Sequence, residues 1–556
     1  MSKWAHKNMA DNAEGPTNSR PEIPAGKGAA PSSAAERWRP KVNPWVIAVV
    51  VAMAAFMEVL DTSIANVALP YMAGGLGAST DESTWVLTSY LVSNAIVLPI
   101  SGWFASVLGR KRFFMICLAI FTLSSLLCGI APSLGAIILF RVLQGAGGGG
   151  LQPMAQGILA DTFPPEKRGL AFALYGVTVV VAPTVGPTLG GWITDNYTWR
   201  WIFFINLPVG ILALFMIFRL IEDPPWAKRV AGAGVKIDYI GVALLTLGVG
   251  ALQVMLDKGQ EEDWFASHFI LILAAVAGVG LVSLVIWEWF YKEPIVEVRL
   301  FKNLNFLGAN AMMFILGIML FSSLVMMPLF LQTLVGYTAE SAGLVLSGGG
   351  LLLLFLMPIA GTLASKVQVR YIIAFGWLAL SFAMYFSTQH LDLEISFRTA
   401  SLVRVVQVFG LGFLFVPITL VSYVGMPAEK SNSVAGLVNF MRNIGSSIGT
   451  SMVTTLISRR AQFHQVYLAA HATAGHPVFV QAVRGLAARL AASGMDTSRA
   501  TRQAYGMLYR ALLGQATTLA YIDTFWVLCV GAGIMFILSF ALKRNEPGAG
   551  GEVAVG

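Results

Sequence analysis

The residues best suited to chemistry in this sequence are two carboxylates within one long apolar segment. Glu58 and Asp61 are three residues apart, so a helix places both on one face. A charged side chain at the centre of a bilayer costs about 2.5–3.5 kcal/mol on insertion scales, so two in one helix need an explanation. A desolvated carboxylate can bind and release a proton, and we interpret both residues as proton-coupling candidates. The alternative for Asp61 is a structural role, in which it bonds to backbone or to a neighbouring helix.

Arg141, in a later apolar segment, is the expected countercharge to these carboxylates. Gln144 and Gln152 follow it on the same helical face, which predicts a polar stripe facing a cavity. If Arg141 approaches the carboxylates, protonation weakens the pairing and provides a switch between two states. A fixed structural ion pair is the alternative. Arg404 and Arg442 are further cations in apolar segments, and the sequence does not name their partners.

Amide side chains inside apolar segments are the candidates for contacts with a bound compound. They are Asn94, Gln144, Gln152, Gln332 and Asn439. Methionine and aromatic neighbours would suit varied ligands, because such surfaces adapt their shape. The alternative is that most of these amides only pack helices together.

Two segments carry residues suited to a change of conformation. Residues 182–191 read APTVGPTLGG; prolines remove helix hydrogen bonds and glycines let helices approach closely. We predict a pliable helix in close contact with a neighbour, with a switching role for Pro183, Gly186, Pro187, Gly190 and Gly191. Gly109 and Arg110 open a basic loop whose cations either pair with acidic groups and lock one conformation, or act only as topology signals.

The elements that must position these residues are membrane-spanning helices. Of the 556 residues, 56% are hydrophobic and only 12% are charged, whereas soluble domains carry about 25% charged residues. Apolar runs of about 20 residues cross a bilayer, and helices satisfy the backbone of such runs. We predict an all-α integral membrane protein with about fourteen spans, near 44–70, 83–105, 112–131, 134–157, 168–192, 199–220, 236–256, 268–290, 304–332, 340–365, 370–389, 398–425, 430–458 and 520–542.

The distribution of basic residues predicts the orientation of the chain. One side's short loops hold several clusters, among them 110–112, 167–168, 228–229 and 543–544. The other side's short loops hold mainly Arg200, Lys258 and Arg398. The positive-inside rule assigns the first side to the cytoplasm, together with both termini. No cleavable signal peptide is apparent before the first apolar run.

A weak internal repeat divides the spans into two sets. The segments at Arg141 and Arg404 resemble each other, and the same offset (404 − 141 = 263) links Gly147 to Gly410. Together with the spans, the repeat predicts a six-helix half at 44–222, a linker with two extra spans at 223–300 and a second six-helix half at 301–543 that includes the loop 459–519. The polar, Pro- and Gly-rich composition before the first span predicts a disordered cytoplasmic tail at 1–43, and a second cytoplasmic tail follows at 544–556.

One segment between the last two predicted spans breaks the charge pattern. Residues 459–519 carry seven arginines on the outer side, and a loop of this length is largely exempt from the rule. Apolar spacing within 478–492 predicts helical content. The segment is interpreted either as a solvated helical hairpin or as a docking surface for a periplasmic partner. His464, His471 and His476 are too loosely spaced to favour a metal site over a solvated loop.

Four segments together resemble the fourteen-helix drug:proton antiporters of the major facilitator superfamily. Residues 60–70, LDTSIANVALP, resemble the first-helix signature, and the segment at Arg141 resembles the fourth-helix motif, whose arginine is implicated in proton coupling. Residues 182–191 resemble the fifth-helix antiporter motif, and 199–208, WRWIFFINLP, also fit. The resemblance covers about 44–543 and is strongest to the EmrB-like branch of the EmrB/QacA group. It implies the major facilitator fold, with two six-helix halves and two linker helices.

The resemblance implies a proton-coupled exporter of amphipathic or aromatic drugs in the inner membrane of a Gram-negative bacterium. It also implies a tripartite pump with an EmrA-like membrane-fusion adaptor and a TolC-like outer-membrane channel. The expected energy source is the proton gradient, without a cofactor. Two residues depart from the family pattern: Ser106 stands where the second-to-third-helix loop usually carries Asp, and Glu58 is not part of the first-helix signature.

Other classes of function fit the sequence less well. A dedicated exporter of a fatty or aromatic acid is an alternative, because intramembrane arginines could attract carboxylates. A non-transporting membrane sensor would need a large signalling domain, which neither predicted tail provides. The sequence holds no Walker A phosphate loop and no catalytic cluster, so we predict neither ATP drive nor an enzyme. The net charge of +8 is dispersed at the ends of apolar runs, which argues against nucleic acid.

Overall fold

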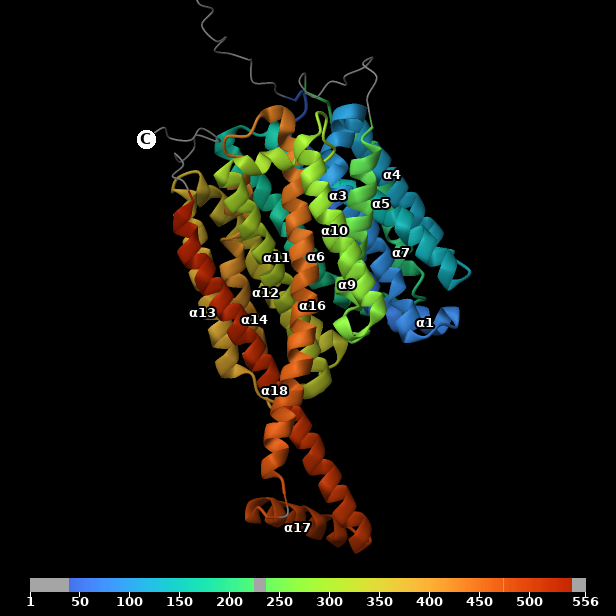
Figure 1. The fold of residues 1–556 in the computed structure, drawn as a ribbon, viewed down its shortest axis with the longest axis vertical. Coiled ribbons are helices and arrows are strands. Elements are labelled where there is room, and N and C mark those ends of the chain that lie inside the picture. Colours follow the sequence, from blue (N-terminus) through green and yellow to red (C-terminus); the bar gives the residue numbers. More distant parts are fainter. Residues whose placement is uncertain (1–39, 225–236, 474, 543–556) are drawn as a thin grey trace, which may run out of the picture. The chain divides into compact units, whose positions relative to one another are not determined.

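Helices make up the regular structure of the described residues, which are 40–224, 237–473 and 475–542 in this computed structural model (Figure 1). Three sequence predictions lie outside these residues: the tail at 544–556, the basic clusters at 228–229 and 543–544, and the tail at 1–43 apart from its last four residues. The orientation of the chain across a membrane stays a prediction.

The helices follow the predicted apolar runs closely. Their bounds are α1 Pro44–Leu76, α2 Thr80–Ser83, α3 Trp85–Leu108, α4 Arg110–Gly129, α5 Leu134–Thr162, α6 Pro165–Asn196, α7 Trp201–Phe204, α8 Asn206–Leu220, α9 Tyr239–Lys258, α10 His268–Phe290, α11 Leu304–Phe330, α12 Ala339–Ala364, α13 Val369–His390, α14 Phe397–Gly412, α15 Phe415–Ser422, α16 Ser431–His471, α17 Pro477–Ala492 and α18 Thr497–Leu538. The two extra spans predicted before residue 300 form as α9 and α10.

Thirteen helical stretches among the described residues are long and apolar enough to cross a membrane. The span predicted at 430–458 is helical, as part of α16, but is not among the thirteen. The reason is its polarity, since α16 carries Asn432, Asn439, Arg442 and Asn443. Several of these polar side chains face other helices: Asn439 and Arg442 are buried and bond to α5. The total of fourteen spans therefore stays a prediction.

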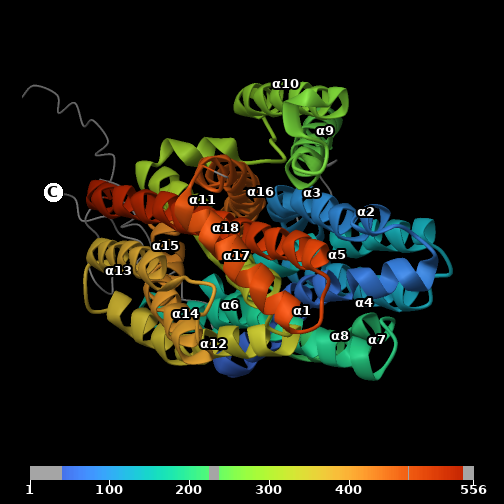
Figure 2. The same ribbon diagram turned by 90° about the horizontal axis from the view of Figure 1, so that it is seen from below.

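Two helix groups pack side by side (Figure 2), and we call α1–α8 the first group and α11–α18 the second group. The seams between them are α6 against α12, and α16 against α3 and α5. At one point α6 and α12 meet backbone to backbone, because a Cβ atom on Gly169 would overlap the carbonyl of Gly361 and the reverse also holds. Small residues permit such close helix contact inside a bilayer.

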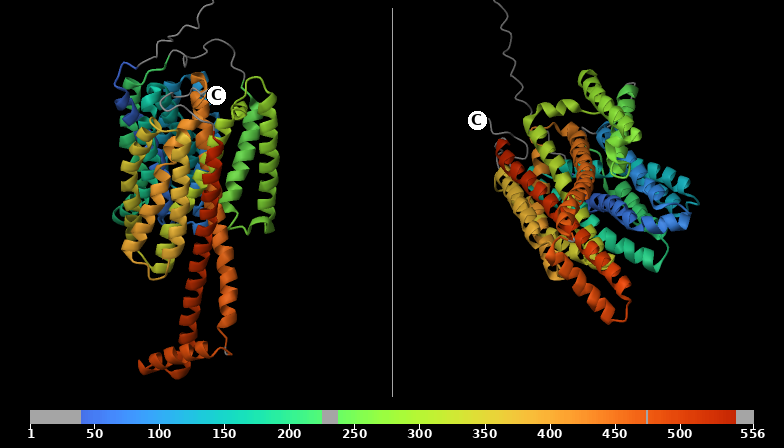
Figure 3. Two further views of the ribbon diagram at one scale, coloured as in Figure 1. Left: turned by 90° about the vertical axis from the view of Figure 1, so that its left-hand side faces the viewer. Right: turned by 60° about the horizontal axis from the view of Figure 1, so that its bottom comes forward.

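The helices α9 and α10 pack against each other at the edge of the two groups (Figure 3), and α9 touches one helix from each group. Gln253 exchanges hydrogen bonds with Ser447 of α16, at 2.9 and 3.1 Å. Near the end of α9, Asp257 accepts a hydrogen bond from Thr88 of α3. The α9 helix therefore lies along the seam between α3 and α16.

The segment predicted as an outer loop, 459–519, is largely helical, as expected. The helix α16 continues to His471, α17 covers the predicted 478–492 region, and α18 begins at Thr497. These three pieces form a hairpin that projects beyond the helix bundle, with α17 lying across its tip (Figure 1). Arg460 and His464 both bond to Asp523 of α18, at 2.6 and 2.7 Å, where the hairpin leaves the bundle.

Candidate functional site

The centre of the first group holds a buried ion pair between α1 and α5. Arg141 Nη1 lies 2.6 Å from Asp61 Oδ2, and both side chains are almost fully inaccessible. Arg141 Nε also donates to the Val86 carbonyl at 3.1 Å, which ties the guanidinium to α3. A buried pair of this kind is costly to break, because either partner left alone is an uncompensated charge.

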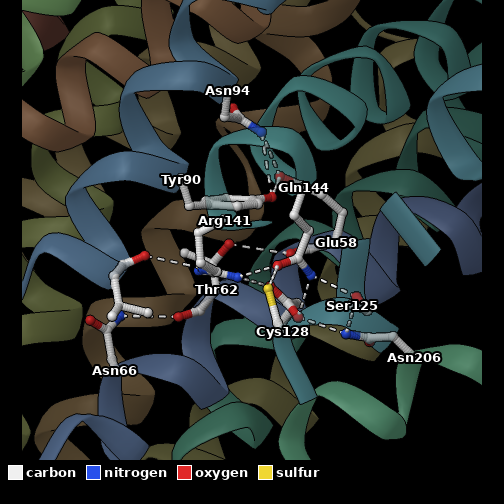
Figure 4. Close-up of polar contacts among 12 residues, drawn as sticks. Glu58, Thr62, Asn66, Tyr90, Asn94, Ser125, Cys128, Arg141, Gln144 and Asn206 are labelled. Carbon is white, nitrogen blue, oxygen red and sulfur yellow. Dashed lines mark hydrogen bonds and ion pairs between the residues drawn. The ribbon is translucent and has the colours of Figure 1, made fainter. Parts of the chain in front are cut away.

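Amide side chains complete the coordination of Asp61. Figure 4 labels these amides, Gln144 and Asn206, together with Ser125 and Arg141. The second carboxylate oxygen accepts from Gln144 at 3.0 Å and from Asn206 of α8 at 2.6 Å. Both amides also donate to Ser125 of α4, and Arg141 donates to the Gln144 oxygen at 2.7 Å. We call these five residues, Asp61, Ser125, Arg141, Gln144 and Asn206, the Asp61 cluster. All of them belong to the first group.

Glu58, one turn before Asp61, belongs to a different network. Its carboxylate accepts from Tyr90 at 2.8 Å, from Asn94 at 3.0 Å and from Gln152 at 2.6 Å. Glu58 is buried, and no countercharge among the described residues lies within 4.0 Å of it. Three neutral donors therefore carry the stabilisation of this carboxylate.

The Glu58 network reaches the second group through Gln152. The Gln152 oxygen accepts from Tyr175 at 3.2 Å and from the guanidinium of Arg442 in α16. The single hydroxyl proton of Tyr175 is shared with Asn439 Oδ1, which lies 3.1 Å from the Tyr175 oxygen. The predicted contact residues Asn94, Gln152 and Asn439 thus lie in one chain of hydrogen bonds that crosses the seam between the groups.

Tyr90 stands between the two carboxylates. Its hydroxyl bonds to Glu58, and its ring lies under the Arg141 guanidinium, 4.3 Å from the ring centroid. A cation over an aromatic face is stabilised electrostatically, more so when water is absent. The two carboxylate sites of α1 are therefore connected through a single side chain.

The basic loop after α3 also finds an acidic partner. Arg110 pairs with Asp161 at the end of α5, and Asp161 accepts a 3.0 Å hydrogen bond from Ser431 of α16. Gly109 adopts a positive φ of 84°, which suits glycine. Ser106, at the family's Asp position, donates to the Trp103 carbonyl of its own helix. The Arg110–Asp161 pair is thus the ion pair that this loop makes, and it adjoins the second group.

The proline-rich part of α6 is an unbroken helix packed against α1 and α12. Pro187 lacks an N–H group, so the carbonyl of Pro183 has no partner within the helix. Ser63 of α1 donates to that carbonyl at 3.1 Å. A side chain at Gly186 would overlap Ser63 of α1, and one at Gly190 would press tightly against Ile64 of α1. The predicted close contact with a neighbour is therefore present, whereas the pliability of α6 stays a prediction.

Comparison with known proteins decides the family. The family model described as Major Facilitator Superfamily matches residues 51–450. The chain belongs to the major facilitator superfamily. Two relatives share its length: the multidrug export protein EmrB of Haemophilus influenzae is 38% identical over 89% of this chain and 95% of the relative. EmrB of Escherichia coli K12 is 35% identical over 91% and 96%.

A third relative differs in the compound that it is named for. The fatty acid resistance protein FarB of Neisseria gonorrhoeae is 41% identical over 76% of this chain and 82% of the relative. Among solved structures, the proton:xylose symporter XylE has a TM-score of 0.56 at 12% identity, covering 91% of this chain and 97% of XylE. That likeness concerns the fold alone. The relatives confirm the predicted EmrB-type transporter family, and the protein is a transporter rather than an enzyme.

Within this major facilitator transporter, Gln332 is the predicted contact residue that stands apart. It is exposed in the π-helical segment Leu331–Val335, which directly continues α11, and it makes none of the bonds described above. In the part of the chain that the structure describes, the histidines of the hairpin do not gather with other ligand side chains into a possible metal site. The roles assigned to all of these residues stay predictions.

Several members of the networks were not predicted from the sequence, among them Tyr90, Ser125, Asn206, Tyr175 and Asp161. Asn206 lies in the recognised segment 199–208, so the motif itself was the available signal. Tyr90 and Tyr175 look like ordinary aromatic residues in apolar runs. Asp161 was detectable as a carboxylate just before a predicted loop, three positions ahead of Pro164.

Proposed function

We propose that this transporter is a proton-coupled antiporter that exports amphipathic or aromatic compounds by alternating access. Substrates enter from the cytoplasm or the inner leaflet, and protons enter from the opposite side and reset the carrier. The proton gradient is the energy source, and no cofactor takes part. The observation that carries the proposal is the Asp61–Arg141 pair, at 2.6 Å and inaccessible to solvent, in the middle of a transporter.

The Asp61 cluster supplies a reason for protonation to change the structure. A proton on Asp61 removes the negative charge that compensates Arg141, so the pair loses its electrostatic advantage. The amides of Gln144 and Asn206 would then have to rearrange, because a protonated carboxyl is a donor as well as an acceptor. Glu58 is the second proposed proton site, since its network extends to Arg442 in the second group.

The driving force suffices for useful export. One elementary charge crossing 100 mV yields about 2.3 kcal/mol. At about 1.4 kcal/mol per decade, that sustains a concentration gradient of roughly fortyfold.

A second candidate is a dedicated exporter of a fatty or aromatic acid. It is favoured by the 41% identity to a fatty acid resistance protein and by the buried arginines Arg404 and Arg442. Guanidinium groups bind carboxylates through paired charge-assisted hydrogen bonds.

We further propose that the protein is the inner-membrane part of a tripartite pump, with both termini in the cytoplasm. The hairpin of α16, α17 and α18 would then project into the periplasm, where an EmrA-like adaptor and a TolC-like channel would continue the path. Exposed apolar side chains on the hairpin, including Val466, Tyr467 and Val478, support a protein contact there.

The test is proton release from proteoliposomes when a lipophilic cation or an aromatic acid is added. Asp61→Asn should abolish substrate-dependent proton movement, and Glu58→Gln should reduce or abolish it. Asp195→Asn, at an exposed carboxylate of α6, is the matched control and should behave like the native protein. Full coupling in both α1 variants would exclude the proposed proton sites. The charge of the preferred substrate would choose between drug pump and acid exporter.

A further inference from the structure

Arg404 is a buried cation without an anionic partner. It lies in α14 with 1% of its surface exposed. It donates to Ser323 Oγ at 3.3 Å and to Gln407 Oε1 at 3.4 Å, both long contacts, and its Nε has no partner. Among the described residues, no carboxylate oxygen lies within 4.0 Å of it.

The surroundings of Arg404 repeat those of Arg141, with one difference. In both places the arginine bonds to a glutamine three residues later, and that glutamine bonds to a serine of the next packed helix: Gln144 to Ser125 at 2.7 Å, and Gln407 to Ser387 at 2.9 Å. In the first group the guanidinium also meets a carboxylate, that of Asp61. In the second group it meets the hydroxyl of Ser323 instead.

Two other arginines of the described residues are buried near the centre of the bundle. Arg141 pairs with Asp61, and Arg442 is linked through Gln152 to Glu58, so each lies in a network that holds a carboxylate. The described hydrogen bonds of Arg404 lead only to Ser323, Gln407 and Ser387. An arginine does not deprotonate in proteins, so its charge cannot be removed by titration, and a buried guanidinium requires an anion for its full stabilisation.

We propose that Arg404, together with Ser323 and Gln407, binds the carboxylate group of an amphipathic substrate. The substrate anion takes the place that Asp61 holds beside Arg141. The planar guanidinium offers paired N–H donors that match a carboxylate, and Ser323 offers a hydroxyl. Arg404 is buried in this structure, between Ser323 of α11 and Gly349 of α12, so the anion reaches it when the helices packed around α14 separate during the transport cycle. This inference rests on the proposed export function for its physiological meaning.

The experiment compares the binding of two twelve-carbon probes, dodecanoate and dodecyltrimethylammonium, to the purified full-length protein in nanodiscs. Arg404→Gln removes the cation, and Ser323→Asp supplies an internal carboxylate while keeping Arg404. Both variants should weaken dodecanoate binding by about tenfold or more, as the loss of a charge-assisted contact implies, and should leave binding of the ammonium probe within about twofold of native. Arg398→Gln, at an exposed arginine of the same helix, is the matched control.

The Ser323→Asp variant also separates loss of binding from loss of folding. Its new ion pair should keep thermal stability at or above the native value, so weaker dodecanoate binding in that variant reports an occupied site. Native dodecanoate affinity in both variants, or no dodecanoate binding by the native protein, would overturn the inference without affecting proton-coupled export of cations. Dodecanoate binding that depends on Arg404 in a protein that moves no protons would instead contradict the proposed function and leave the anion site standing.

Discussion

At the scale of single residues, the two carboxylates of α1 differ in what holds them. Asp61 has a formal countercharge and partners only within the first group. Glu58 has neutral donors, one of which, Gln152, also holds Arg442 of the second group. A change in the protonation of Asp61 would therefore act first within the first group, whereas a change at Glu58 would also act on Gln152, which bonds to Arg442 of the second group.

Removing one charge of the Asp61–Arg141 pair should lower the free energy of unfolding more than removing both charges, because the remaining charge is buried without a countercharge. Arg141→Gln leaves a buried carboxylate, and we expect it to lower the free energy of unfolding by about 3–5 kcal/mol. The double variant Asp61→Asn with Arg141→Gln should lose clearly less than the two single losses together. Reversible unfolding in mixed micelles measures all three. Strictly additive losses would mean that the two side chains do not interact.

Tyr90 allows its two contacts to be separated. Tyr90→Phe keeps the ring under Arg141 but removes the hydroxyl that donates to Glu58, a charged-group hydrogen bond worth about 1.5–3 kcal/mol. Tyr90→Leu removes both. We expect proton release in proteoliposomes to fall in Tyr90→Phe and to fall further in Tyr90→Leu. An equal fall in the two variants would show that the hydroxyl contact with Glu58 matters and that the ring under Arg141 adds nothing.

The sequence identifies Arg141 as the expected countercharge to the carboxylates of α1, because opposite charges in apolar segments have few other partners. It does not tell which of Glu58 and Asp61 the arginine meets. It does not predict Tyr90 or Asn206, since a tyrosine or an asparagine in a helix carries no sign of which neighbour it faces. The same limit applies to Gln332. It carries the same kind of amide as the other candidates, but it is exposed in the π-helical segment that continues α11. The neighbour that a side chain faces is decided by how the helices pack, and a single sequence does not give that packing.

At the scale of elements, α6 depends on α1 for a missing hydrogen bond. Ser63 replaces the helix bond that Pro187 cannot make to the Pro183 carbonyl. The proline motif of α6 and the signature segment of α1 are therefore one structural unit, although they are 120 residues apart in sequence.

This dependence gives a rescue experiment. Ser63→Ala leaves the Pro183 carbonyl unsatisfied and should destabilise the protein by about 1–3 kcal/mol. Adding Pro187→Ala restores the N–H group and should recover part of that loss, even if Pro187→Ala alone impairs transport. Thermal stability in detergent measures the cycle. No recovery in the double variant would show that the carbonyl finds another donor.

The length and polarity of α16 explain where the helix predictions were strong and weak. Apolar runs correctly predicted the thirteen spanning stretches, and apolar residues at helical spacing correctly predicted α17. The helix α16 is less apolar because it lies at the seam, where its amides and arginine bond to the first group. The docking of α9 along the same seam uses serine, threonine and glutamine, residues that give no long-range signal in sequence.

At the scale of the whole molecule, the polar bonds between the two groups gather toward one end of α5. They run from Gln152 through Gln156 to Asp161, whereas the Asp61 cluster bonds only within its own group. If that end is cytoplasmic, as the basic loops predict, the structure corresponds to a state closed toward the cytoplasm.

A cross-link should hold this state. Gln156 and Asn439, hydrogen-bonded at 2.5 Å, are replaced by cysteine in a protein whose three native cysteines are alanine. Bridging the pair with a short bifunctional thiol reagent should stop transport, and reduction of a disulfide-linked reagent should restore it. The unlinked double variant and the two single-cysteine variants are the controls. Continued transport by the bridged protein would show that α5 and α16 need not separate.

The hairpin is continuous with helices inside the bundle, and this has a mechanical consequence. The helix α16 runs for 41 residues without interruption, which corresponds to about 60 Å at about 1.5 Å per residue. A helix of that length is a lever arm: a tilt of about 5° at its inner end displaces the outer end by about 5 Å. If the second group rocks during transport, the tip at α17 therefore moves further than the inner end of α16. A partner bound at that tip would be displaced once in each transport cycle.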